Sequence, residues 1–382
     1  VYDTDEDEVR LLWRESIHHP TDWAGEVSNI VYDPVNDRLL LSRADGHANL
    51  GVYELGRRGG DAKRLSEDPS LKGTLFLDHA CFDIMRSFRV GFEGVQCLDL
   101  VEGRWTRQRL PDLAQVSLDG HGVVTPLVGA VASAYARLFA FVKGGVVVGN
   151  PLEPEREPMR FVRLLDFGFN GYGPLRTVAL PLGGGLLVAF NAYTHGLLNP
   201  SSEEEKLYAE FLNTIVGPST LVYIAPPMAR IVAGLGARVT TMELVGEKLL
   251  LGVDTTANLM RLDATPIDAG ERGLVELSAS TLLASQPPPL SFSVPGRAIR
   301  GVAWGGVPLE GYREPRLVLR LTHRNRLHIY EYDLALPPAH AHEEVVDVPQ
   351  GRSVVELSGY SGVVSFRFEE EDPGAWIRIE LR

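Results

Sequence analysis

One pattern recurs along this chain and constrains its fold more than any other feature. It is clearest at residues 39–55, which read LLLSRADGHANLGVYEL, and variants return at 249–262 and 317–330. Two short apolar runs around a polar turn are typical of a β-hairpin. A hairpin that returns several times in one chain indicates a repeat architecture built from small antiparallel sheets.

The first repeat can be followed strand by strand. We expect four antiparallel strands within residues 27–66, because turn-forming residues separate its apolar runs. Four such strands make one propeller blade. The run YDPVNDRLLL at 32–41 resembles the first hairpin of many β-propeller blades, and the whole sequence resembles an uncharacterised archaeal protein family. These resemblances imply a seven-bladed β-propeller and identify no catalytic residue.

Blade-like groups of strands follow along the whole chain. The first six are predicted at 27–66, 80–110, 128–167, 176–233, 238–278 and 298–348. Residues 353–381 then supply only three strands, and residues 9–15 form an unassigned strand before the first blade. We therefore predict one all-β domain over 1–382, a seven-bladed β-propeller whose last blade is closed by strands from both termini. Closure of this kind removes open sheet edges.

A segment in the fourth blade departs from the strand pattern. Residues 202–205 read SEEE, a capping box in which the serine and the glutamate three positions later satisfy backbone N–H groups. Leu207, Phe211 and Ile215 follow at helical spacing. The sequence predicts a short helical insertion at 199–218, either a surface decoration or a lid or partner contact.

Composition excludes some classes of function. The net charge is −13 over 382 residues and no basic stripe occurs, so nucleic acid is not an expected partner. No apolar run has the length of a membrane span, and no signal peptide distinguishes a cytoplasmic from a secreted protein. Basic residues are mainly arginine, and thermolabile residues are scarce, which favours a thermophilic source.

The expected strand register places the two cysteines on different strands of the second blade. Cys81 falls on the first predicted strand of the second blade and Cys97 on the third. Strands two places apart are separated by about 9–10 Å, beyond the reach of a disulfide. The sequence therefore predicts two free thiols.

Histidines gather where propellers usually place ligands. In each blade, the loop entering strand one and the turn between strands two and three lie on one face, which we call the upper face. Histidine ligates metals or moves protons near neutral pH, and a metal site needs several ligands from separate loops. The candidate metal ligands, for a divalent ion, are His18, His19, His47, His79 and His121. Ordinary turn chemistry explains the same residues if they do not converge.

Other polar and aromatic residues of the predicted loops could contact a small ligand. The candidates are Trp23, Asp45, Tyr172, Tyr193 and Arg324. Two functions remain open. The first is a binding or assembly scaffold that presents a histidine-rich face to a protein partner, to itself or to a small ligand. The alternative is a metal-dependent lyase or hydrolase with a histidine-lined funnel and a small polar substrate.

Overall fold

The protein is an assembly of small antiparallel sheets. The computed structural model describes residues 2–3, 7–14, 27–43, 51–85, 92–110, 128–168, 172–174, 177–192, 218–254, 272–299, 301–335 and 341–382. Within these ranges there are seven sheets of three to five strands and a two-stranded ribbon. This confirms the all-β prediction, while the arrangement of the sheets differs in part from the seven predicted blades. Of the predicted helical insertion at 199–218, residues 199–217 lie outside the described residues.

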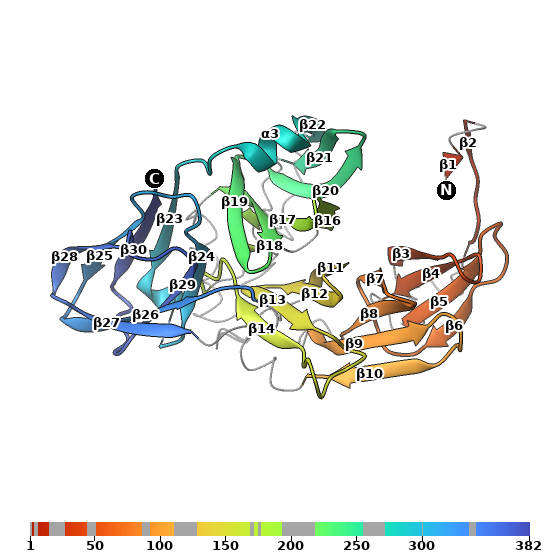
Figure 1. Ribbon diagram of the computed structural model, residues 1–382, viewed down its shortest axis with the longest axis horizontal. Helices are drawn as coiled ribbons and strands as arrows, with labels where there is room; N and C mark the ends of the chain where they lie inside the picture. Colours follow the sequence, from red (N-terminus) through yellow and green to blue (C-terminus); the bar gives the residue numbers. More distant parts are fainter. Residues whose placement is uncertain are drawn as a thin grey trace, which may run out of the picture.

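The first five sheets follow one another as propeller blades do. Their first strands, β3, β7, β11, β16 and β20, lie innermost and each contacts the next (Figure 1). The strands of the first three sheets are β3 (Val27–Asp33), β4 (Arg38–Arg43), β5 (Gly51–Gly56) and β6 (Lys63–Ser66), then β7 (Gly73–Phe76), β8 (His79–Met85), β9 (Phe92–Asp99) and β10 (Trp105–Arg109), then β11 (Val128–Ala134), β12 (Arg137–Val142), β13 (Gly145–Gly149) and β14 (Arg160–Arg163).

The fourth and fifth sheets continue the series. Their strands are β15 (Tyr172–Gly173), β16 (Ala179–Leu182), β17 (Gly185–Ala192), β18 (Ser219–Ala225) and β19 (Met228–Leu235), then β20 (Arg238–Val245), β21 (Lys248–Asp254) and β22 (Arg272–Ser278). In the fifth sheet β22 pairs directly with β21. It therefore occupies the third place in the sheet. The sequence predicts residues 258–263 for that place, and they lie outside the described ranges.

The second sheet corrects the predicted register. Its first strand is β7, which the sequence reading missed because a two-residue turn joins β7 to β8 without glycine; Leu77 there has φ 55°. Cys81 and Cys97 therefore lie on neighbouring strands, directly opposite each other, and form a disulfide with a Cα–Cα distance of 4.0 Å. The prediction of two free thiols is wrong, and its cause is this shift by one strand.

The last eight strands have a different topology. They form two four-stranded sheets, in the orders β23-β30-β25-β28 and β24-β29-β26-β27. This is the connectivity of a double-sheet jelly roll. The strands are β23 (Leu290–Pro295), β24 (Trp304–Pro308), β25 (Arg316–Leu321), β26 (Asn325–Tyr332), β27 (His342–Val348), β28 (Gly351–Glu356), β29 (Val363–Phe368) and β30 (Trp376–Leu381). A six-residue helix, α3 (Ala279–Ala284), precedes them.

The strand pairing predicted for the last two blades is therefore wrong. The repeat at 317–330 is not a hairpin, since β25 pairs with β28 and β30 while β26 pairs with β27 and β29. Residues 9–14, the described part of the predicted strand at 9–15, do not complete a blade with 353–381. Only Val9 belongs to a strand there, in the ribbon of β1 (Tyr2–Asp3) and β2 (Glu8–Val9), while Leu12 and Trp13 pack on the first blade.

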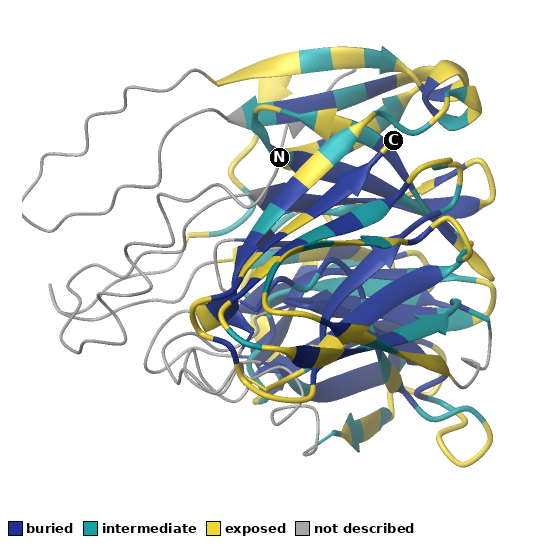
Figure 2. Ribbon diagram, turned by 90° about the vertical axis from the view of Figure 1, so that its left-hand side faces the viewer, coloured by how far each residue is buried: buried dark blue, intermediate teal, exposed yellow. Residues whose placement is uncertain are grey.

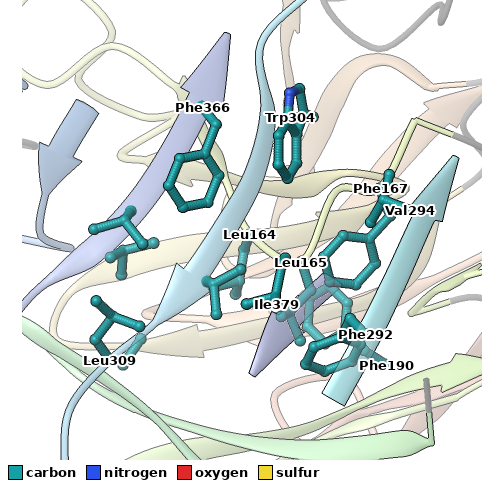
Figure 3. Packing of buried hydrophobic residues seen from close by; sticks show 14 of the residues in the cluster. Leu164, Leu165, Phe167, Phe190, Phe292, Val294, Trp304, Leu309, Phe366 and Ile379 are labelled. Carbon is teal, nitrogen blue, oxygen red and sulfur yellow. The ribbon is translucent and has the colours of Figure 1, made fainter. Parts of the chain in front are cut away.

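One buried core joins the jelly roll to the blades. Strand β24 lies against β14 and β19, the outer strands of the third and fourth blades. Phe292 of β23 packs against Phe167, with ring centroids 4.8 Å apart (Figure 3). It also packs against Tyr172, with ring centroids 5.9 Å apart. The Tyr332 hydroxyl donates a hydrogen bond to the Arg163 carbonyl at 2.7 Å. Because this junction is apolar and closely packed, it fixes the jelly roll relative to the blades.

Candidate binding face

Most residues of the predicted sites lie outside the described ranges. These are His18, His19, His47 and His121 of the metal set, and Trp23, Asp45 and Tyr193 of the ligand set. Their convergence stays a prediction. Among the described residues, no group of three or more His, Cys, Asp or Glu side chains could hold a metal ion. Within the same residues, no helix has the length and hydrophobicity of a membrane span.

The three predicted site residues that are described lie apart from one another. His79 begins β8, after the turn between strands one and two, so it lies at the end of the blade opposite to the upper face; its Nδ1 is 2.6 Å from Asp78 Oδ1. Tyr172 is a core residue whose hydroxyl lies 2.9 Å from Thr220 Oγ1, and burial raises its pKa. Arg324 is exposed in the jelly roll and pairs with Asp347 at 3.4 Å.

A buried polar network lies where the first two blades meet on the upper face. Asp83, near the end of β8, accepts hydrogen bonds through Oδ1 from the backbone N–H groups of Leu71 and Lys72 and from the Ser70 hydroxyl. Its Oδ2 has no hydrogen-bond partner among the described residues. Burial raises the pKa of Asp83 to about 6, against the effect of these hydrogen bonds. The network anchors the segment that enters β7.

A cleft opens on the outer side of the same two blades, and charged residues line it. Asp68 accepts hydrogen bonds from Arg107 Nε at 2.8 Å and from Arg109 Nη2 at 2.9 Å. Arg109 also pairs with Glu93 at 2.6 Å, and Arg64 pairs with Glu67 at 3.1 Å. We call these six residues the blade junction. Every arginine of the blade junction has a carboxylate partner. The junction therefore links the outer strands of the two blades, and none of its arginines is left without a partner.

The jelly roll carries a third group of charged residues, on the outer side of its first sheet. Because side chains alternate across a strand, one face of β25 and β30 is core, with Leu317, Leu319, Ile377 and Ile379 fully buried. The opposite face holds the residues between them. We call it the arginine face. Its positions are Ser291, Ser293, Pro295, Arg316, Val318, Arg320, Arg352, Val354, Glu356, Trp376, Arg378 and Glu380, of which Pro295 and Glu380 are buried.

Register divides this face into rows that cross the strands. In one row, Glu380 lies opposite Arg316, and Arg316 lies opposite Glu356. Glu380 accepts a hydrogen bond from Arg316 at 2.7 Å and also pairs with Arg378 and Arg382. Burial acts to raise the pKa of Glu380, but the hydrogen bond from Arg316 and the nearby arginine charges outweigh it and lower that pKa. The charges of this row are therefore compensated.

The charges of the row at the other end of the arginine face are not compensated. Arg320 lies directly opposite Trp376 on one side and Arg352 on the other. All three are exposed, and Trp376 is 44% exposed. Within the described part of the chain, neither arginine has a hydrogen bond or an ion pair. We call these three residues the Trp376 row. It places two like charges and an open aromatic ring side by side.

Figure 2 views the molecule from the side where the jelly roll lies, and exposed and buried residues alternate there along the strands. The alternation was visible in the sequence, as RLVLRL at 316–321 and WIRIEL at 376–381. Both segments were correctly predicted as strands. The site was missed because the pairing of β25 with β28 and β30 joins segments that were assigned to different blades.

The blades and the jelly roll define an all-β protein in which a propeller-like body is followed by a jelly-roll sandwich. The family model of uncharacterised proteins conserved in archaea matches residues 1–262, so the chain belongs to that family. The match ends before the jelly roll begins. A search of curated proteins finds no match to this chain.

Solved structures show distant similarity. The chain resembles the extracellular domain of a putative one component system of B. thetaiotaomicron (9% identity, 64% of this chain and 27% of that chain, TM-score 0.39). It is also similar to an exo-beta-1,3-galactanase of Phanerochaete chrysosporium (8%, 94% and 96%, 0.33) and to the Cps50 beta-propeller domain of Myceliophteria thermophila (11%, 90% and 97%, 0.35). The chain thus spans about a quarter of the first of these. At these TM-scores, none bears on what the chain binds.

Proposed function

We propose that the protein is a binding scaffold whose blades form the frame and whose jelly roll presents the arginine face to an anionic ligand. The observation that carries this proposal is the Trp376 row. Like charges directly opposite each other on neighbouring strands are destabilising. Arg320 and Arg352 are in that position without a carboxylate partner among the described residues.

The charge of the whole protein makes this row unusual. At a net charge of −13, the chain needs no further cations for solubility, and it carries 50 acidic residues that could have compensated these two arginines. A planar guanidinium binds carboxylate, sulfate or phosphate groups through paired hydrogen bonds. Two of them beside an exposed indole form a surface that suits an anion with an apolar portion.

A thermal-shift experiment tests the proposal. An anion that binds the folded state raises the melting temperature in proportion to the logarithm of its concentration. We expect citrate or glucuronate to stabilise the full chain at low ionic strength, and we expect the Arg320→Gln/Arg352→Gln variant to lose most of that shift. Arg57→Gln, an exposed arginine of the first blade, is the control. Equal shifts in all three proteins would contradict the proposal.

The histidine-rich upper face remains a separate proposal, now without His79. Metal analysis of the purified protein tests whether its four remaining histidines form the site of a metal-dependent enzyme. Stoichiometric transition metal that is lost from a His47→Ala/His121→Ala variant would support it. Self-association is tested by light scattering, where a concentration-independent monomer would contradict it.

A further inference from the structure

We infer that the ligand of the arginine face is a saccharide that carries a carboxylate, of the uronic-acid type; this rests on the proposed function. The Trp376 row offers an apolar contact and a charged contact within a short distance. The row crosses three neighbouring strands, so its ends are about 10 Å apart. That distance matches one or two sugar rings.

The chemistry of the row separates an apolar contact from a charged one. The Trp376 ring is exposed at the β30 side of the row, and aromatic rings pack well on the C–H face of a flat, partly apolar ligand. Arg320 follows on β25 and Arg352 on β28, where two guanidinium groups can share one carboxylate. A uronic acid presents both features, because its pyranose ring has an apolar face and its carboxylate projects from the ring edge.

The neighbouring row extends the apolar part of this surface. Val318 lies opposite Val354 and opposite Arg378. Val354 is 45% exposed, so a second apolar contact lies next to the Trp376 row. A free phosphate or sulfate could use the two arginines, but it would leave Trp376 and Val354 exposed to water.

Size and charge argue against a larger partner. Four strands of six residues cover roughly 20 Å by 20 Å, or about 400 Å². A stable protein–protein interface buries about 800 Å² on each partner. The overall negative charge also opposes a long polyanion at low ionic strength. A short ligand with one or a few carboxylates satisfies both limits.

Titration calorimetry of the full chain at low ionic strength tests this inference, with trigalacturonate as the probe. Neutral galactotriose, inorganic phosphate and a hexaglutamate peptide are the comparison ligands. We expect trigalacturonate to bind at least about tenfold more tightly than the other three. Trp376→Ala and Arg320→Gln should each weaken binding about tenfold or more. Trp376→Phe should restore most of the affinity, and Arg57→Gln should change nothing. Cooperative thermal unfolding of each variant, at a melting temperature no lower than that of the wild type by more than a few degrees, would show that the variants fold.

The outcomes separate this inference from the proposed function. If phosphate binds as tightly as trigalacturonate and Trp376→Ala has no effect, the face binds anions but the saccharide is wrong. If hexaglutamate alone binds and needs Trp376, the ligand is an acidic protein segment, and the inference is again overturned while the scaffold stands. If no anion binds, both proposals fall.

Discussion

The blade junction and the arginine face both gather several arginines on the outside of β-sheets, yet they differ in how those charges are compensated. In the blade junction, Arg64, Arg107 and Arg109 each have a carboxylate within 3.1 Å. On the arginine face, Glu380 compensates the arginines of one row, and the Trp376 row has no carboxylate among the described residues.

This difference separates two uses of arginine. A paired arginine on a surface contributes only about 0–1 kcal/mol, and it is no longer available to a ligand. An unpaired arginine opposite another one costs a little stability and remains available. Departures from local rules that nothing nearby compensates are expected at functional sites. The arginine face shows both situations on one sheet, which makes it possible to test them separately.

The largest change in stability is expected on replacement of Asp83, the buried carboxylate where the first two blades meet. Asp83→Asn keeps an oxygen that can accept the hydrogen bonds of Ser70, Leu71 and Lys72. The folded pKa of Asp83 is about 6, above the 3.8 of an ordinary aspartate. The folded state therefore binds the proton more tightly, and stability decreases as pH rises from about 4 to about 6.

The asparagine variant should not show this decrease. At pH 8 it should be more stable than the wild type by about 2–3 kcal/mol, since each pKa unit corresponds to about 1.4 kcal/mol. At pH 4 the two should be equal. Guanidinium denaturation at both pH values measures the difference. A variant that is less stable at pH 8 would show that the ionised carboxylate is compensated after all.

The next largest effect concerns the compensated row of the arginine face. Glu380→Gln leaves Arg316, Arg378 and Arg382 without their shared carboxylate, and we expect a loss of about 2 kcal/mol at pH 7. The pKa of Glu380 is lowered, so its contribution is present above the ordinary pKa of glutamate and is lost as pH falls through the lowered value. The difference between variant and wild type should therefore vanish in acid.

Glu356→Gln is the matched control for that experiment. Glu356 lies opposite Arg316 on the other side, but it is exposed. Its replacement should cost less than about 0.5 kcal/mol. Similar losses for both variants would mean that Glu380 has no special role in organising the face.

The blades could be predicted from the sequence because their information is local. The four strands of the first blade are close together in the sequence, and β3, β4, β5 and β6 pair in chain order. Apolar runs and turn residues are sufficient to place such strands. Where a turn lacked its usual residues, as at Leu77, one strand was missed, and with it the disulfide between Cys81 and Cys97.

The jelly roll and its face could not be predicted in the same way. Its pairs are distant in sequence: Leu290 lies opposite Leu381, and Arg316 lies opposite both Glu356 and Glu380. An apolar run, a polar turn and a second apolar run look identical in a hairpin and in a crossing between two sheets. The Trp376 row exists only once this non-local register is known, so a single-sequence pattern could not assemble it.

A smaller effect is expected at the exposed end of the blade junction. Asp68→Asn removes the carboxylate that Arg107 and Arg109 share, but the Asp68 side chain is 20% exposed and both arginines are more so. We expect a loss of about 0.5–1 kcal/mol at 0.1 M salt. Salt screens exposed pairs, so the same measurement in 1 M NaCl should show less than half of that loss. A loss that does not depend on salt would indicate a packing effect instead.

The smallest effect on stability is expected in the Trp376 row, and it is a gain of stability, whereas the changes at Glu380 and Asp68 cause losses. Arg352→Glu converts the Arg320–Arg352 pair into a pair of opposite charges, which should stabilise the protein by about 0.2–1 kcal/mol. Arg352→Gln only removes the repulsion and should give a smaller gain. Both variants should lose anion binding in the thermal-shift experiment. If the Trp376 row reduces stability in order to bind a ligand, the variant should be more stable and should no longer bind the anion. Destabilisation by Arg352→Glu would instead show that Arg352 has a structural partner.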